Sequence, residues 1–122
     1  MGEGPAVLVT GAAGYVGRLC VAALAKRLGE LSALVALDWT EIDASERIAG
    51  VVYAQDDICD PALKDLFVEH GVDTVVHLAS IVRAPKGAPA DLAHRVDVLG
   101  TKNVLEACES AGAKRLIVTS TG

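Results

Sequence analysis

The sequence predicts an α/β fold built on an open, doubly wound parallel sheet, and three observations lead to it. Short apolar runs of strand length alternate along the chain with stretches of helical periodicity, as in parallel sheets covered by helices on both faces. Hydrophobic residues make up 52% of the 122 residues but aromatic residues only 3%, which suits buried β-branched strands under Ala- and Leu-rich helices. A glycine-rich loop follows the first apolar run, where such folds place their ligand loop.

The first half of the chain contains three expected strands. The run at 6–10 is continuously apolar and ends at a glycine, and apolar residues then recur at helical spacing over 14–28. A second strand is expected at 34–38, and a third, weaker one at 51–55. The stretch between them, 39–49, is mostly polar and has room for one turn of helix.

The second half continues the alternation. A helix is expected over 60–70, because it starts with Asp as a cap and Pro in the first turn. A strand at 74–78, a long helix at 91–111 and a strand at 116–120 follow. The expected strand order is 3-2-1-4-5. We therefore expect 1–122 to be one domain, truncated after its fifth strand, where a further helix and strand of this fold would follow.

Composition argues against several classes of function. The formal net charge is −5, and no cluster of Lys or Arg offers the positive face that nucleic acid or a membrane surface requires. No apolar run reaches the roughly 18 residues of a membrane span, and no signal peptide is recognisable. The three cysteines, Cys20, Cys59 and Cys108, are widely spaced and lack metal-ligand partners, so they are interpreted as small hydrophobes in a reducing cytoplasm. No metal site is expected.

The loop after the first strand carries three glycines, Gly11, Gly14 and Gly17, in the spacing GxxGxxG. In a Rossmann-type domain such glycines allow a tight turn, close approach of the backbone to a pyrophosphate, and close packing of helix on strand. The N–H groups at the start of the following helix, around Tyr15 and Val16, would hold the phosphates. A tight strand–helix turn that binds no ligand is the alternative.

An acidic residue ends the second expected strand. Asp38 lies 21 residues after Gly17, close to the roughly 20 expected for the carboxylate that binds the adenosine ribose. A carboxylate there accepts hydrogen bonds from the ribose hydroxyls and repels a 2′-phosphate, so NAD is favoured over NADP as the cofactor. An ordinary solvated strand end is the alternative interpretation of Asp38.

Four segments together resemble a known family, the extended short-chain dehydrogenase/reductases, which are the NAD-dependent epimerases and dehydratases. Residues 9–17 resemble its TGxxGxxG loop, and Asp57-Ile58 resembles its acidic segment after the third strand. Residues 76–80, VHLAS, are similar to its HxAA motif, and residues 96–107, VDVLGTKNVLEA, resemble its NVxGTxNxLEAA helix. The match covers almost the whole chain, and the ordered set is far more specific than any single motif.

The resemblance implies further cofactor-binding residues. Asp57 would hydrogen-bond the adenine amino group with the Ile58 backbone beside it, although Asp57 is also interpretable as a surface acid in an acidic loop. Leu78, Ala79 and Ser80 would lie against the cofactor, because parallel strands place their carboxyl ends at one crevice.

Two residues of the later motifs carry different expectations. Asp97 stands where the family usually has Asn, and an ionised Asp only accepts hydrogen bonds. Asp97 is kept among the cofactor-binding candidates on the motif alone. His77 is interpreted as a packed, hydrogen-bonded strand histidine rather than a catalyst.

The resemblance also implies a chemistry: hydride transfer between NAD and a nucleotide sugar or related alcohol. A Tyr in a YxxxK pair acts as base in this family, and a Ser or Thr after the fifth strand holds the substrate hydroxyl. Thr121 is the better match for the latter and Ser120 the second, with a polar strand terminus as the alternative. Tyr15 and Tyr53 are the only tyrosines of the chain, and neither has Lys four residues later.

Three hypotheses follow. The chain is the cofactor-binding part of such an enzyme, expected to be inactive alone; or a non-catalytic NAD(H)-sensing module; or a truncated fragment without turnover. A homo-oligomer is expected, because the family's helix matching 91–111 packs against a partner subunit. An exposed apolar last strand would add a second pairing surface.

Overall fold

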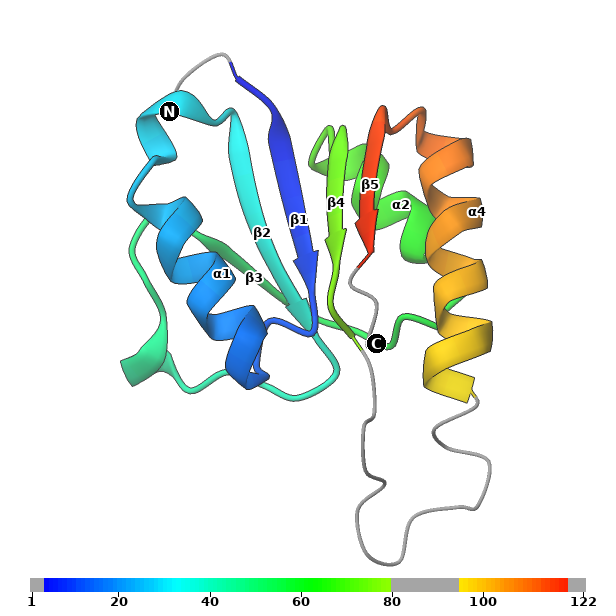
Figure 1. Ribbon diagram of the computed structural model, residues 1–122, viewed down its shortest axis with the longest axis horizontal. Coiled ribbons are helices and arrows are strands. Elements are labelled where there is room, and N and C mark those ends of the chain that lie inside the picture. The colour runs from blue at the N-terminus through cyan, green and yellow to red at the C-terminus, as the bar shows by residue number, and fades with distance from the viewer. Residues whose placement is uncertain (1–3, 80–94, 119–122) are drawn as a thin grey trace, which may run out of the picture.

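The computed structural model describes residues 4–79 and 95–118. Its five strands form one sheet in the order β3-β2-β1-β4-β5, and every neighbouring pair is parallel (Figure 1). The predicted fold class and strand order are therefore confirmed. The strands are β1 (Ala6–Thr10), β2 (Ala33–Asp38), β3 (Val52–Gln55), β4 (Thr74–His77) and β5 (Arg115–Val118).

Helices cover both faces of the sheet. α1 packs on one face, and α2 and α4 pack on the other (Figure 1). Short 3-10 turns at Leu28–Glu30 and Ala44–Glu46 and a π-helical turn at Arg95–Gly100 complete the described elements. The α-helices are α1 (Tyr15–Ala25), α2 (Leu63–Glu69) and α4 (Thr101–Ala111).

Element boundaries differ from the sequence-based expectation at several ends. α1 stops at Ala25 rather than at 28, because the chain tightens there into the 3-10 turn Leu28–Glu30. The long helix expected over 91–111 is helical throughout its described part, as the π-helical turn Arg95–Gly100 followed by α4. β4 ends at His77, one residue earlier than expected, because the N–H of Leu78 turns to a side-chain acceptor.

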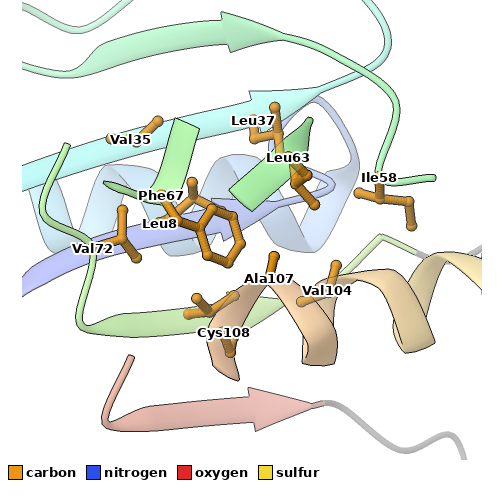
Figure 2. Close-up of a cluster of buried hydrophobic side chains, with 11 residues drawn as sticks. Leu8, Val35, Leu37, Ile58, Leu63, Phe67, Val72, Val104, Ala107 and Cys108 are labelled. Atoms are coloured by element: carbon orange, nitrogen blue, oxygen red, sulfur yellow. The ribbon is translucent and has the colours of Figure 1, made fainter. Parts of the chain in front are cut away.

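β1 is buried on both faces, which explains its unbroken apolar sequence. Leu8 points into the cluster that holds Phe67 of α2 and Val104 of α4, whereas Val7 and Val9 point into the cluster under α1. Figure 2 shows side chains from the strands, α2 and α4 gathered around Phe67, which is fully buried. The sheet therefore positions β1 rigidly between two cores.

None of the three cysteines forms a disulfide bond. Cys108 is buried, and Cys20 and Cys59 are half-buried, as expected for small hydrophobes. Burial raises the pKa of the Cys20 and Cys108 thiols, which keeps them protonated and unreactive. Within 4–79 and 95–118, no helix is long and apolar enough to cross a membrane.

The carboxyl ends of the strands meet at one edge of the sheet. Thr10 at the end of β1 is in register with Leu37 on one side and with His77 on the other. Strand order reverses between β1 and β4, and open parallel sheets bind ligands outside the strand ends at such a reversal. The fold therefore places the site candidates together at the end of β1.

Candidate functional site

An open cleft of about 810 Å³ lies at this edge. Its walls are the glycine loop after β1, the turns after β2 and β3, the residues after β4, and the N-terminal part of α4 with the preceding turn. It brings together seven of the predicted cofactor-binding residues: Gly11, Gly14, Asp38, Asp57, Ile58, Leu78 and Ala79. Several other lining residues with polar or aromatic side chains were not predicted as site residues from the sequence, among them Arg18, Trp39 and Asn103.

The glycine loop needs glycine at its first and third positions for steric reasons. Gly11 has a φ of +68°, and a Cβ there would come within 2.8 Å of the Ala79 nitrogen. A Cβ on Gly17 would overlap the carbonyl oxygen of Gly11. Gly14 differs, because a Cβ there would meet only the Gly11 carbonyl oxygen at 3.4 Å and the residue is exposed. Gly14 thus leaves the backbone open toward the cleft.

Asp38 joins the glycine loop to the turn after β2. Its Oδ2 accepts a hydrogen bond from the Ala13 N–H at 2.9 Å, and its Oδ1 accepts one from the Thr40 N–H at 2.9 Å. The residue is only 8% exposed, which excludes an ordinary solvated strand end. Each carboxylate oxygen retains a second lone pair, so Asp38 can hold the loop and still accept hydroxyl donors from a ligand.

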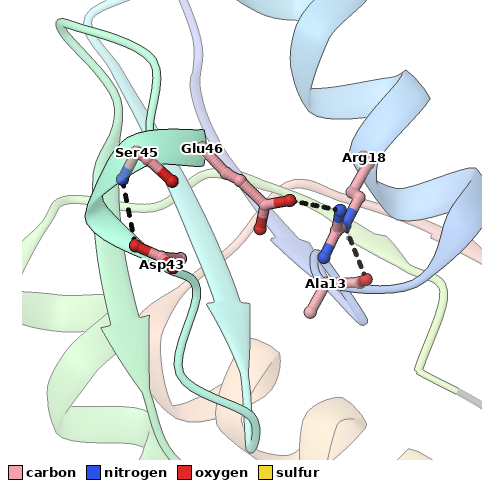
Figure 3. A network of polar contacts seen from close by, with 5 residues as sticks. All are labelled: Ala13, Arg18, Asp43, Ser45 and Glu46. Atoms are coloured by element: carbon pink, nitrogen blue, oxygen red, sulfur yellow. Dashed lines mark hydrogen bonds and ion pairs between the residues drawn. The ribbon is translucent and has the colours of Figure 1, made fainter.

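Arg18, on the first turn of α1, fixes the other side of Ala13. Its Nε donates to the Ala13 carbonyl oxygen at 2.9 Å, and its Nη1 lies 3.0 Å from Glu46 Oε1 (Figure 3). Both backbone groups of Ala13 are therefore held by charged side chains. The loop is consequently preorganised without any ligand contact.

A buried chain of hydrogen bonds holds the base of the loop. The Thr10 hydroxyl oxygen accepts the N–H groups of Leu78 and Ala79, each at 3.0 Å, and lies 2.8 Å from His77 Nδ1. Because both lone pairs of this oxygen are used, its proton must go to His77 Nδ1. His77 Nε2 then carries the ring proton and donates to Thr101 Oγ1 at 2.8 Å. The chain links β1, β4 and α4.

This chain requires a neutral imidazole. Burial lowers the pKa of His77, and the negative charge of Asp97 offsets only part of this decrease. A second ring proton on Nδ1 would face a Thr10 oxygen that already accepts two hydrogen bonds. The interpretation of His77 as a packed, hydrogen-bonded strand histidine is confirmed.

The acidic turn after β3 is fixed to α4 by an amide. Asn103 Nδ2 donates to the carbonyl oxygens of Ile58 and Asp60, each at 2.7 Å. The Ile58 side chain is buried in the core, so only its backbone is available to a ligand. Asp57 is exposed and its Oδ1 accepts the Cys59 N–H at 2.8 Å. Burial raises the pKa of the neighbouring Asp56, with Asp60 and Asp57 adding repulsion.

The other predicted site residues either do not line the cleft or lie outside the described residues. Tyr15 and Val16 begin α1 with side chains 75% and 59% exposed, so their backbone N–H groups remain the candidates for binding. Asp97 is exposed in the π-helical turn and is not among the residues that line the cleft. Its cofactor role, like those of Tyr15 and Val16, stays a prediction. Three further candidates lie outside the described residues: Ser80, Ser120 and Thr121.

Known proteins match this chain over nearly all of its length. The sequence model of the NAD dependent epimerase/dehydratase family matches residues 7–122. A 2-alkyl-3-oxoalkanoate reductase of Stenotrophomonas maltophilia (strain K279a) is 32% identical over 115 residues, covering 94% of this chain and 33% of that protein. A UDP-glucose 4-epimerase of Halalkalibacterium halodurans is 32% identical over 119 residues, covering 95% of this chain and 34% of that protein.

A solved structure extends the likeness to three dimensions. The UDP-glucose-4-epimerase from Stenotrophomonas maltophila, with bound NAD and formylated UDP-arabinopyranose, superposes with a TM-score of 0.77 at 30% identity. The match covers 97% of this chain and 37% of that one. The chain therefore spans about a third of the length of the relatives it matches.

Proposed function

The chain belongs to the NAD-dependent epimerase/dehydratase family, and on that premise we propose that it is the NAD-binding portion of an oxidoreductase. The observation that carries the proposal is the buried Asp38 carboxylate, which holds the glycine loop at Ala13 while lining the cleft. The proposed reaction is hydride transfer to or from a nucleotide sugar or a related alcohol.

The residues of the cleft fit the parts of NAD in turn. The glycine loop and the first N–H groups of α1 would hold the pyrophosphate, because these groups have no partner within the helix. Asp38 would accept the hydroxyls of the adenosine ribose, and Asp57 the adenine amino group. Ala79, with its small side chain near the end of β4, would allow close approach of the nicotinamide half. When bound, NAD supplies the hydride acceptor or donor.

The substrate class rests on similarity. One similar protein is a UDP-glucose 4-epimerase, and the similar solved structure contains a UDP-sugar beside NAD, which supports a nucleotide sugar. Thr121, with Ser120 as the second candidate, would hydrogen-bond the substrate hydroxyl. Proton transfer in this chemistry requires a base, and neither Tyr15 nor Tyr53 has Lys four residues later. We therefore expect the 122 residues to bind the cofactor without turnover.

The buried Asp38 carboxylate at the cleft equally favours one alternative, a module that senses NAD(H) without catalysis. Both proposals require the cleft to bind the dinucleotide, and they differ in turnover when the chain forms part of its natural protein. We also propose a cytoplasmic location, which the lack of disulfide bonds among the three cysteines supports.

We further propose a homo-oligomer. Leu105 of α4 is 46% exposed, and Ile117 and Val118 of the edge strand β5 are 53% and 50% exposed, which supports pairing through these elements. Light scattering at micromolar concentration should give at least a dimeric mass, and a monomeric mass would contradict this assignment.

Calorimetric titration with NADH tests the cofactor proposal. The wild-type chain should bind one NADH saturably. Gly14→Val should weaken binding by at least about tenfold, or 1.4 kcal/mol, because its side chain would occupy the open approach to the loop while meeting little of the protein. Glu69→Gln, on the exposed face of α2, is the matched control and should bind like wild type.

Two results would overturn these expectations. Equal NADH binding by wild type and Gly14→Val would place the cofactor elsewhere. NADH formation from NAD and a UDP-sugar by the 122 residues alone, followed by absorbance, would contradict the expected lack of turnover.

A further inference from the structure

Arg18 and Asp38, the residue that is proposed to bind the ribose, hold the same residue of the glycine loop. Its guanidinium donates to the carbonyl oxygen of Ala13, whose N–H donates to Asp38. Arg18 and Asp38 are thus attached to the two sides of a single residue, and both line the cleft. A ribose held by Asp38 would thus lie in the cleft that Arg18 also lines.

These two side chains have opposite preferences for the dinucleotide. A carboxylate accepts hydrogen bonds from a free 2′-hydroxyl, whereas an Arg nearby accommodates a 2′-phosphate. Guanidinium groups bind phosphate through two parallel hydrogen bonds. With Arg18 available, the cleft would carry one determinant for each form of the cofactor.

Glu46 engages Arg18 from the turn between β2 and β3. Its Oε1 lies 3.0 Å from Arg18 Nη1 (Figure 3). The turn that carries Glu46 is itself fixed, because Asp43 accepts the Ser45 N–H at 3.2 Å and Arg47 Nε donates to the Ile42 carbonyl oxygen at 2.9 Å. Glu46 is therefore held in position to face the loop.

This ion pair contributes little to stability. The side chains of Arg18 and Glu46 are 53% and 47% exposed, and exposed pairs are worth about 0–1 kcal/mol. An ion pair of so small a stabilising effect can still limit which ligand groups the Arg18 guanidinium binds. Glu46 itself is not among the described residues that line the cleft, so its side chain acts toward the loop through the pair with Arg18.

We propose that Glu46 is a specificity-determining residue, which engages Arg18 so that this guanidinium does not bind a 2′-phosphate. The preference for the unphosphorylated dinucleotide then depends on two residues, Asp38 and Glu46, of which the second lies on a different turn. This inference rests on the proposed cofactor function and adds a determinant to it.

Two adenosine probes test the inference by calorimetry on the whole chain: 5′-AMP and adenosine 2′,5′-bisphosphate, which differs by the 2′-phosphate. Wild type should bind 5′-AMP more tightly. Glu46→Gln should improve the affinity ratio for the bisphosphate over 5′-AMP by about 1.4- to fivefold, the range of one exposed ion pair. Because the readout is a ratio within one variant, changes in loop order that affect both probes equally cancel.

Two variants show whether the effect passes through Arg18. Glu41→Gln removes a charge that lines the cleft but whose ion-pair partner is Arg47, at 3.9 Å, so it should shift the ratio by less than Glu46→Gln. In Arg18→Met/Glu46→Gln the gain should disappear, as expected for coupled residues.

The outcomes separate the two proposals. An unchanged ratio in Glu46→Gln, an equal shift in Glu41→Gln, or a gain that persists without Arg18 overturns the role of Glu46 alone. If wild type binds neither NADH nor 5′-AMP, the proposed cofactor function fails, and this inference fails with it.

Discussion

The glycine loop is held at its two ends by contacts of opposite character. At its start, Thr10 and His77 are buried and connected by neutral hydrogen bonds to β4 and α4. At its end, Ala13 is held by Asp38 and by Arg18, which pairs with Glu46 in solvent. Buried polar contacts are costly to break, whereas exposed ion pairs contribute little to stability. The first end therefore contributes more to stability, and the proposed ligand selectivity belongs to the second.

The largest expected loss of stability is at Gly17, where helix α1 packs tightly against the glycine loop. Gly17→Ala would force its Cβ onto the Gly11 carbonyl oxygen, so the loop or α1 must shift. We expect a loss of about 1–3 kcal/mol in the free energy of unfolding, as for other overpacked sites, measured by urea denaturation, and loss of NADH binding. Gly29→Ala is the control, because a Cβ there meets nothing within 4 Å. Equal stability of both variants would contradict the packing argument.

The second largest loss of stability is expected at Thr10, in the buried hydrogen bonds at the start of the loop. Thr10→Val keeps the shape but removes the acceptor for two N–H groups and the donor to His77. Leaving buried polar groups unsatisfied costs about 1–3 kcal/mol, so urea denaturation should show a loss in that range. Thr10→Ser retains the hydroxyl and should recover most of it. A change below about 0.5 kcal/mol in Thr10→Val, the size of an ordinary surface substitution, would show that the chain of hydrogen bonds is unimportant.

Lowering the pH should destabilise the fold through His77, which holds the start of the glycine loop. Burial lowers the pKa of folded His77, whereas in the unfolded chain it should titrate near about 6.5. Between the two pKa values the unfolded state binds more protons than the folded state. The contribution of neutral His77 to the free energy of unfolding is therefore fully present above about pH 6.5 and is lost as the pH falls toward the folded pKa. The urea midpoint of wild type should fall more between pH 7.5 and pH 5 than that of His77→Asn. Parallel curves would contradict a neutral buried His77.

The smallest effect is expected at the exposed end. Glu46→Gln should change the free energy of unfolding by less than about 0.5 kcal/mol, and the difference from wild type should vanish in 1 M salt because of screening. Urea denaturation at two salt concentrations measures both. A loss comparable to that of Thr10→Val would make Glu46 a structural residue and remove the contrast between the two ends.

The parts of the site that the sequence predicted are those defined by local patterns. The glycine spacing and the position of Asp38 follow from residues within one strand–helix–strand unit, and both appear where expected. The pairs Thr10–His77 and Arg18–Glu46 join residues 67 and 28 positions apart, and no periodicity or motif specifies them. They depend on which strands become neighbours and on how a polar turn folds back over α1.

The boundary of β4 shows the same limit at the scale of one residue. The apolar run predicts a strand through Leu78, but its N–H donates to the Thr10 hydroxyl rather than to a strand neighbour. A contact between residues 68 positions apart therefore decides where this strand ends. At Gly100, by contrast, the helix expected from the sequence continues, because the π-helical turn Arg95–Gly100 passes directly into α4.

The chain contains one tryptophan, and it provides the most direct test of the central claim that the cleft binds NAD(H). Trp39 follows Asp38, lines the cleft and is 60% exposed. NADH bound at the glycine loop should quench Trp39 emission saturably, and NAD should reverse the quenching by competition. Trp39→Phe should lose the signal but keep the calorimetric affinity. No saturable quenching up to about 1 mM NADH, the upper end of ordinary enzyme affinities, in a chain that unfolds cooperatively in urea would contradict the account.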